Sequence, residues 1–255
     1  VIIGTSCTSI DDYCFELCSS LTSVTFEANS SVQSLGQGCF ISCGSLTSIT
    51  IPSSVQSLGD GCFQSSGLTS ITIPYLVTTL PQSCFYGCSS LTSVTFEANS
   101  SLTTIDNACF QNSGLTSITI PSSVQSLGDI CFELCSNLTS ITIPSSVQSL
   151  GDSCFIGCSS LTSFTFEANS SLTTINDSCF QSSGLTSITI PSSVQSLGDN
   201  CFSYCGNLIS VTFEANSSVS LLPNACFLSS ELNSITIPSS VQSLGTSCFN
   251  DCGSL

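Results

Sequence analysis

The stretch LTSITIPSSVQSLGD, residues 46–60, belongs to a phrase whose first seven letters return at Leu68, Leu115, Leu138 and Leu185. Within SITI, polar and apolar residues alternate, as they do in a strand that buries one face. Proline cannot donate to a β-ladder, so the proline that follows ends this strand. The next five residues, VQSLG, alternate again and predict a second short strand or an extended turn.

A Cys-Phe dipeptide closes each copy, and eleven such dipeptides recur at intervals of 22 to 25 residues. This short period predicts a solenoid, because one coil of a solenoid cannot bury its apolar face alone. Asp60 precedes its Cys by two residues and is predicted to cap a single helical turn. The dipeptides begin at Cys14, Cys39, Cys62, Cys84, Cys109, Cys131, Cys154, Cys179, Cys201, Cys226 and Cys248.

Composition excludes several classes of partner. The chain has 16 acidic residues and no Lys, Arg or His, which gives a formal net charge of −16. Without cationic side chains it cannot neutralise phosphates, so we expect no nucleic-acid binding and no docking to anionic membranes. No apolar run approaches the ~18 residues of a membrane-spanning helix, so we expect no direct membrane insertion. The chain begins at Val1 without a visible signal peptide, and we interpret it as a trimmed segment.

The pattern L-x-x-I-x-I-P-x-x-V-x-x-L-G-x-x-C-F-x-x-C resembles the BspA-type leucine-rich repeat, in which Ala-Phe is usual where this chain has Cys-Phe. The resemblance covers residues 7–255. It implies an α/β solenoid, a right-handed leucine-rich repeat superhelix of about eleven coils, with one long parallel β-sheet and short helical turns opposite. It also implies a surface or secreted protein that is linked with adhesion and is not an enzyme.

The whole chain, residues 1–255, is predicted to form a single leucine-rich repeat array. Neither end carries a polar capping repeat, so a monomer of this length would expose its core at both ends. We therefore expect the array to be a segment of a longer solenoid or of one assembled end to end.

The outward positions of the predicted sheet repeat as Ser-x-Thr on ten successive coils. One interpretation is a solvated or protein-contacting face, because Thr suits strands and hydroxyl groups are well hydrated. The alternative is a flat hydroxyl lattice that binds ice or a crystalline polysaccharide. The central part of this candidate surface comprises Ser93, Thr95, Ser117, Thr119, Ser140, Thr142, Ser163 and Thr165.

Eighteen of the 19 cysteines form two columns, one in the Cys-Phe dipeptides and one four residues later, and Cys7 lies outside both. Where the loop to the next Leu is shorter, Ser replaces the second Cys, as at Ser66 and Ser113. We interpret most of the cysteines as small buried side chains that fill the core and keep free thiols. Disulfides between coils in an oxidising compartment are the alternative, and no closed metal site is expected.

Six of the acidic residues lie two positions before a Cys-Phe dipeptide, and we interpret them mainly as helix N-caps. Asp129, Asp152, Asp177 and Asp199 fall on four consecutive coils, without a cation to offset their repulsion. Ca²⁺ or another hard cation is therefore expected to bind weakly along that edge.

The phrase EANSS interrupts the pattern four times and places an Asn in the same slot each time. These four residues and two others match the N-glycosylation acceptor pattern, so several are expected to carry glycans if the source is eukaryotic and the protein is secreted. The predicted acceptors are Asn29, Asn99, Asn137, Asn169, Asn176 and Asn216.

These patterns together predict a non-catalytic extracellular or cell-surface scaffold, either an adhesion protein or a filament-forming structural glycoprotein. Expected partners are the chain itself, by head-to-tail or lateral assembly, or other surface proteins and glycans. No residue set departs from the repeat in the way a catalytic site would, so neither enzymatic activity nor a cofactor is expected. The alternative is an ice-binding or carbohydrate-lattice-binding protein that uses the Ser-x-Thr rows.

Overall fold

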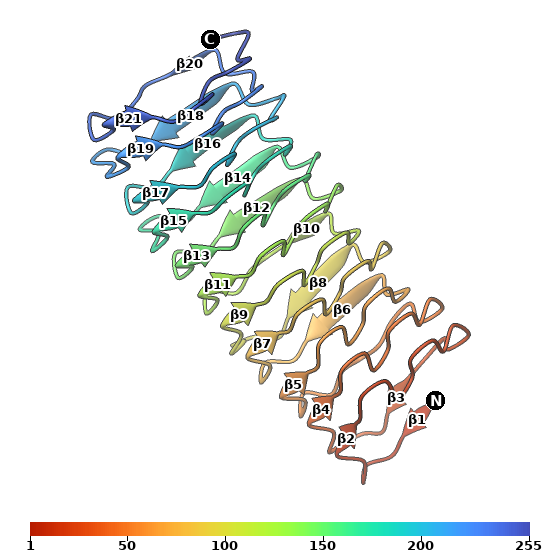
Figure 1. Cartoon of the computed structure of the whole chain (residues 1–255). Coiled ribbons are helices and arrows are strands. Elements are labelled where there is room, and N and C mark those ends of the chain that lie inside the picture. The colour runs from red at the N-terminus through yellow and green to blue at the C-terminus, as the bar shows by residue number, and fades with distance from the viewer.

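The computed structural model describes residues 1–255 as one elongated solenoid of eleven coils, with the two termini at opposite ends (Figure 1). Each coil contains up to two short strands, and the connections between them are turns. No segment is helical, so the prediction of short helical turns is wrong. The chain is a β-solenoid.

The first strand line is formed by the SITI and SVTF segments, in which outward and inward residues alternate. Its strands run along one side of the solenoid (Figure 1). They are β1 (Ile2–Ile3), β3 (Thr25–Phe26), β6 (Ser70–Ile73), β8 (Ser93–Phe96), β10 (Ser117–Ile118), β12 (Ser140–Ile143), β14 (Ser163–Phe166), β16 (Ser187–Ile190), β18 (Ser210–Phe213) and β20 (Ser234–Ile235).

A second strand line comes from the VQSLG segments, so the sequence-based alternative of a second short strand is confirmed. The expected single long sheet is therefore replaced by two strand lines, which divide into six hydrogen-bonded sheets. The second line contains β2 (Ser9–Ile10), β4 (Ser34–Leu35), β5 (Ser57–Leu58), β7 (Thr79–Leu80), β9 (Thr104–Ile105), β11 (Ser126–Leu127), β13 (Ser149–Leu150), β15 (Thr174–Ile175), β17 (Ser196–Leu197), β19 (Leu221–Leu222) and β21 (Ser243–Leu244).

All strand pairs are parallel and join equivalent positions of successive coils. Ser70 pairs with Ser93, for example, and Ile71 with Val94. Because side chains alternate across a strand, this register keeps the Ile and Val residues of β6 to β18 inside and the Ser and Thr residues of these strands on the outer face. Identical repeats therefore produce continuous columns of identical side chains.

The Cys-Phe segments form stacked turns rather than helix. In every coil, the residue before Cys and the second residue after Phe have φ between 48° and 69°. A five-residue segment with two residues in the left-handed backbone conformation cannot form a right-handed helix. The turns are held by hydrogen bonds to the next coil, as from Phe40 N–H to the Cys62 carbonyl at 2.7 Å and from Phe63 N–H to the Cys84 carbonyl at 2.9 Å.

The phenylalanines of these turns form a ladder through the core. Neighbouring rings from Phe15 to Phe249 stack at centroid distances of 5.2 to 5.6 Å, within 20° of parallel. The nine rings from Phe40 to Phe227 are fully buried, together with the leucines and valines of the repeat. The distance between successive coils is therefore nearly constant along this column.

Candidate functional site

The ladder face is the outer surface of the first strand line, and it presents the predicted Ser-x-Thr rows. The register aligns Ser93, Ser117, Ser140 and Ser163 in one row. The side chains of all eight residues in the predicted surface are exposed: Ser93, Thr95, Ser117, Thr119, Ser140, Thr142, Ser163 and Thr165. The sequence therefore placed these side chains correctly on one face, while their binding role stays a prediction.

The residue that follows the SITI or SVTF segment of each coil divides the coils into two kinds. Glu coils have glutamate at this place, and Pro coils have proline. The first coil has Gly4 there. The Glu coils carry Glu27, Glu97, Glu167 and Glu214, and the Pro coils carry Pro52, Pro74, Pro121, Pro144, Pro191 and Pro238.

Strand pairing between successive coils depends on which kind of coil follows. At a closed junction, which leads into a Glu coil, the paired strands join over their full assigned length. This holds for β1–β3, β6–β8, β12–β14 and β16–β18, and the last three pair over four residues each. At an open junction, which leads into a Pro coil, pairing is shorter or absent. Two residues pair in β8–β10 and in β18–β20, one pairs in β10–β12, and β14 is not hydrogen-bonded to β16.

The glutamate closes its junction with two hydrogen bonds. The N–H of Glu97 donates to the Ile73 carbonyl at 3.0 Å, which extends the ladder. Its carboxylate accepts from the N–H of Tyr75, in the preceding coil, at 3.0 Å. The carboxylates of the other three Glu coils accept from the same place in the coil before them, the N–H groups of Thr5, Ser145 and Ser192.

Proline leaves its junction open because it has no N–H to donate. At the open junction before Pro121, Thr116 N–H still donates to the Thr92 carbonyl at 3.3 Å, and Ser117 and Ile118 pair with β8. Neither Thr119 nor Ile120 donates a backbone hydrogen bond to a neighbouring coil. The strands therefore meet where they begin and separate where they end, in a wedge.

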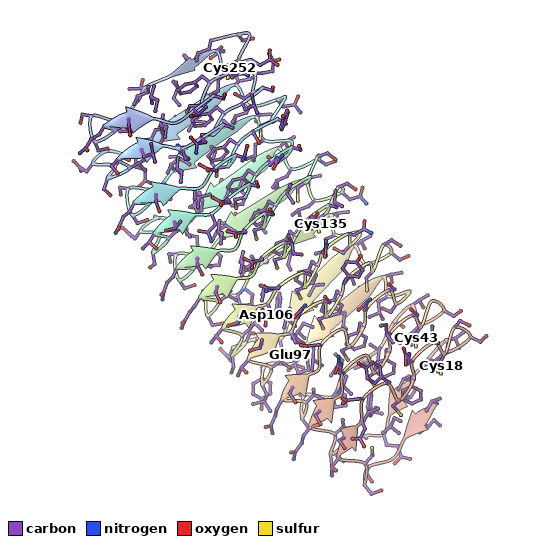
Figure 2. The ribbon with its side chains drawn as sticks, viewed as in Figure 1. Cys18, Cys43, Glu97, Asp106, Cys135 and Cys252 are labelled. Atoms are coloured by element: carbon purple, nitrogen blue, oxygen red, sulfur yellow. The ribbon has the colours of Figure 1, made fainter.

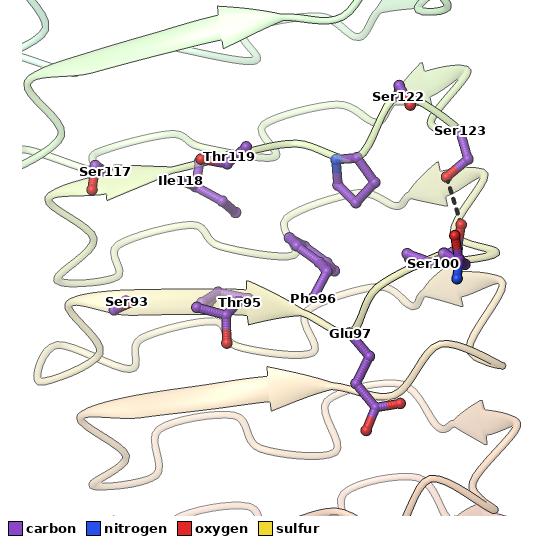
Figure 3. Close-up of a pocket in the computed structure, with 13 residues that line it drawn as sticks. Ser93, Thr95, Phe96, Glu97, Ser100, Ser117, Ile118, Thr119, Ser122 and Ser123 are labelled. Carbon is purple, nitrogen blue, oxygen red and sulfur yellow. Dashed lines mark hydrogen bonds between the residues drawn. The ribbon is translucent and has the colours of Figure 1, made fainter.

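Clefts open on the ladder face at four of the open junctions. The largest, about 600 Å³, separates the strand ends of Thr95–Glu97 and Thr119–Pro121 (Figure 3). In Figure 3 the ring of Phe96 points toward the coil of Thr119, whereas Glu97 points toward the preceding coil. The ice-binding or carbohydrate-lattice alternative calls for unbroken hydroxyl rows, and it stays a prediction.

The column of acidic residues before Cys-Phe has a different role from the predicted helix N-caps, since there is no helix to cap. The Asp129 carboxylate accepts from Asp152 N–H at 2.9 Å, and the Asp177 carboxylate accepts from Asp199 N–H at 2.8 Å. Asn107 makes the same bond to Asp129. These side chains join successive coils, and no group of three or more potential metal ligands gathers along this edge.

The second cysteine column also joins coils. The Cys135 thiol donates to the Phe110 carbonyl of the preceding coil at 3.0 Å, and Cys205 does the same to Phe180. Where Ser takes this place, its hydroxyl contacts the thiol of the next coil, as Ser113 contacts Cys135 at 3.4 Å. Figure 2 shows Cys18, Cys43, Cys135 and Cys252 along one edge of the solenoid.

All 19 cysteines are free thiols in this structure. Burial raises the pKa of fifteen of them, to about 12 for Cys39 and to about 11 for Cys135 and Cys205. A thiol with such a pKa is protonated and unreactive at neutral pH. The columns are therefore suited to packing and hydrogen bonding rather than to nucleophilic chemistry.

The predicted glycosylation acceptors occupy two kinds of place. The four EANSS asparagines are exposed and left-handed, with φ between 60° and 64°. Asn137 is also exposed, whereas Asn176 is half-buried. Asn29, Asn99 and Asn216 line clefts of the ladder face.

The sequence analysis missed the half-buried phenylalanines of these clefts, Phe26, Phe96 and Phe213. In the Pro coils the same place in the strand holds Ile, as in the buried Ile73, Ile120, Ile143 and Ile190. The exchange of Ile for Phe directly before EANSS was visible in the sequence, but its exposure depends on the open junction that follows.

The chain belongs to the family described as "BspA type Leucine rich repeat region (6 copies)", whose model matches residues 8–139 and 125–255. It is similar to the solved structure of a leucine-rich repeat protein from Bacteroides ovatus, with 24% identity over 100% of this chain and 76% of that one and a TM-score of 0.55. A leucine-rich repeat protein from Eubacterium ventriosum has 20% identity over 98% and 90% of the two chains and a TM-score of 0.53.

A third solved structure, described as a leucine rich cell surface protein from Faecalibacterium prausnitzii, has 24% identity over 100% of this chain and 77% of that one, with a TM-score of 0.51. At these identities the likeness establishes the fold. No curated protein matches the sequence. The structure contains no helix with the length and apolar character needed to cross a bilayer.

Proposed function

We propose that this chain is a non-catalytic extracellular or cell-surface scaffold that makes adhesive contacts through its ladder face. The observation that carries the proposal is the alignment of exposed hydroxyl side chains over successive coils of a rigid core. A surface that repeats in register presents the same contact many times, which raises avidity without requiring a deep site. The description of one similar structure as a cell surface protein motivates the same location here.

Lysine substitutions on two faces of the solenoid test this proposal. One variant combines Thr119→Lys with Thr142→Lys on the ladder face, and its matched control combines Ser90→Lys with Ser136→Lys at exposed turn positions. Beads coated with each protein are passed over an epithelial cell monolayer under flow. We expect the ladder-face variant to lose at least about tenfold in retention, because repeated weak contacts act together, and the control to keep it.

Equal retention of both variants would show that the ladder face is not the contact surface. Retention of the unmodified chain no better than that of albumin-coated beads would contradict adhesion altogether. Circular dichroism of each variant verifies that the introduced charges leave the fold intact.

We further propose that the exposed EANSS asparagines carry glycans when the chain is secreted from a eukaryotic cell. Their exposure and turn conformation give a transferase access to the side chain, whereas half-buried Asn176 is less accessible. Peptide mapping of secreted protein should find Asn29, Asn99, Asn169 and Asn216 modified and Asn176 bare. Four bare EANSS asparagines would contradict this proposal.

A further inference from the structure

Three clefts of the ladder face have the same construction, because each lies where a Glu coil is followed by a Pro coil. Their volumes are about 600, 420 and 410 Å³, for the clefts that follow Glu97, Glu27 and Glu214. Pockets of a few hundred Å³ accommodate small ligands or short segments of a polymer. The repetition along one face indicates a ligand that repeats as well.

The lining of these clefts combines one aromatic surface with many hydroxyl groups. In the largest cleft, half-buried Phe96 and Pro121 provide the apolar part. Serine and threonine hydroxyls surround them, and each can donate and accept a hydrogen bond. The N–H of Thr119, which has no backbone acceptor, adds a donor at the open end of the strand. A sugar ring has the complementary properties, an apolar face and a rim of hydroxyl groups.

The charge of the site favours an uncharged ligand. The one carboxylate in the lining, Glu97, is occupied by the Tyr75 N–H at 3.0 Å and by the Ser53 hydroxyl at 2.8 Å. The chain has no Lys, Arg or His, and its net charge is −16, so an anionic ligand would be repelled and could form no ion pair with a side chain.

We propose that these three clefts, defined by Phe26, Phe96 and Phe213, are subsites for a neutral polysaccharide, with the phenylalanine ring under one face of a sugar. This inference rests on the proposed contact role of the ladder face and names the ligand class of that face. The first two clefts are three coils apart, and each step measures 5.4 to 5.6 Å along the phenylalanine column. A single extended polymer chain can therefore engage several subsites at once.

The fourth junction of this kind, after Glu167, differs in one residue. Phe164 stands where the other Glu coils have Val24, Val94 and Val211. Its ring lies edge-to-face at 5.1 Å from Phe166, the counterpart of Phe96. Because a neighbouring aromatic ring already packs against Phe166, we do not include the junction among the subsites.

Affinity electrophoresis tests the proposal with the full chain produced in bacteria, where the asparagines carry no glycan. The probes are dextran, laminarin, mannan and xyloglucan, with dextran sulfate as the anionic comparison. We expect at least one neutral polymer to retard the chain and dextran sulfate to leave its mobility unchanged. If no neutral polymer retards the chain, the polysaccharide proposal is wrong. Retention of protein-coated beads on cells would in that case still support the proposed adhesive role of the ladder face.

Two matched triple variants locate the binding. Thr50→Phe, Thr119→Phe and Thr236→Phe together fill the three clefts from exposed wall positions, whereas Ser48→Phe, Thr72→Phe and Thr189→Phe add the same rings to the ladder face outside these clefts. We expect the first set to weaken binding at least about tenfold, since all linked subsites are lost together, and the second set to preserve it. Equal losses would overturn the cleft assignment and leave the ladder face as the contact surface.

Glycans attached to the chain itself would be a second source of sugar for these clefts, because Asn29, Asn99 and Asn216 line them. Protein secreted from a eukaryotic host provides this arm of the experiment. Polysaccharide binding that is absent when these asparagines are glycosylated, and that returns after enzymatic removal of the glycans, supports the clefts as sugar sites.

Discussion

The junction between β6 and β8 and the junction between β8 and β10 differ in one decisive residue, although they share a strand. Glu97 extends the first ladder to four paired residues, and Pro121 limits the second to two. The phenylalanine rings behind them are 5.4 and 5.3 Å apart, so the core does not separate along with the strands. One backbone N–H at the strand end, present in glutamate and absent in proline, thus decides whether the surface is closed or hollow.

If this comparison is correct, the phenylalanine column should be equally strong behind both kinds of junction. Phe63 has open junctions on both sides, whereas Phe110 has a closed junction before it and an open one after it. Phe63→Ala and Phe110→Ala should each lower the free energy of unfolding by about 3–5 kcal/mol, because both rings are fully buried. Denaturant titration measures both, and a much smaller loss at Phe63 would show that open junctions weaken the core.

The buried thiols should make the whole array sensitive to alkali. Burial raises the pKa of Cys135 and Cys205 to about 11, so these thiols stay protonated in the folded chain where they ionise in the unfolded one. Their stabilising contribution is complete below pH 9, the ordinary pKa in the unfolded chain, and is lost as the pH rises toward 11. One pKa unit corresponds to about 1.4 kcal/mol, so about two to six thiols with shifts of this size together match a typical stability of about 5–15 kcal/mol.

We therefore expect cooperative unfolding between pH 9 and about 11, followed by circular dichroism in the presence of a reductant. The same titration without reductant tests the disulfide alternative. A fold that persists above this range only without reductant would show that disulfides, rather than thiols, join the coils.

A substitution that opens a closed junction should lower the free energy of unfolding by less than the removal of a core phenylalanine ring does. Glu97→Pro removes the N–H that donates to Ile73 and the carboxylate that accepts from Tyr75. We expect the free energy of unfolding to fall by about 1–3 kcal/mol, the usual range for a lost hydrogen bond and its unsatisfied partner. Glu97→Gln is the matched control: it keeps the N–H and an acceptor oxygen, so its loss should be below about 1 kcal/mol. Equal losses would mean that the backbone donor is not what closes the junction.

The smallest predicted effect concerns the turns that contain Cys-Phe, whose backbone geometry is the same beside open and closed junctions. Leu134 is exposed and adopts a φ of 56°, a left-handed conformation that disfavours leucine and that asparagine tolerates. Leu134→Asn should raise the free energy of unfolding by about 0.5–1 kcal/mol, as measured by denaturant titration. Ser136→Asn, at a position without positive φ, is the control, and an equal gain there would argue against relief of backbone strain.

Much of the architecture could be predicted from the sequence, because a solenoid converts repeat positions directly into columns. The inward positions of Ile and Leu and the exposed Ser-x-Thr rows followed from the repeat spacing, and the family followed from the resemblance of the repeat pattern to the BspA type. The helical turns were predicted wrongly, because nothing in Asp-x-Cys-Phe distinguishes a helix N-cap from a turn whose residues adopt positive φ. Residues such as Leu134 and Ile130 are unfavourable in that conformation, so composition gave no warning.

The clefts could not be predicted because they depend on pairs of successive coils. The sequence shows Glu97 and Pro121 as equivalent positions, and it even shows that proline ends a strand. That glutamate closes the junction before it, and that proline opens the next, follows only from the direction in which each N–H points. Phe96 becomes half-buried for the same reason, since the coil that would cover it is held away at its strand end.

Amide hydrogen exchange of the unmodified chain and of Pro121→Glu tests the central claim most directly. In the unmodified chain, the Glu97 amide should exchange slowly and the Thr119 amide rapidly, because only the first is hydrogen-bonded to another coil. In Pro121→Glu, the amide introduced at position 121 should be protected like that of Glu97, and protection of Thr119 should rise at least about tenfold. Rapid exchange at both positions in a folded variant would contradict the account.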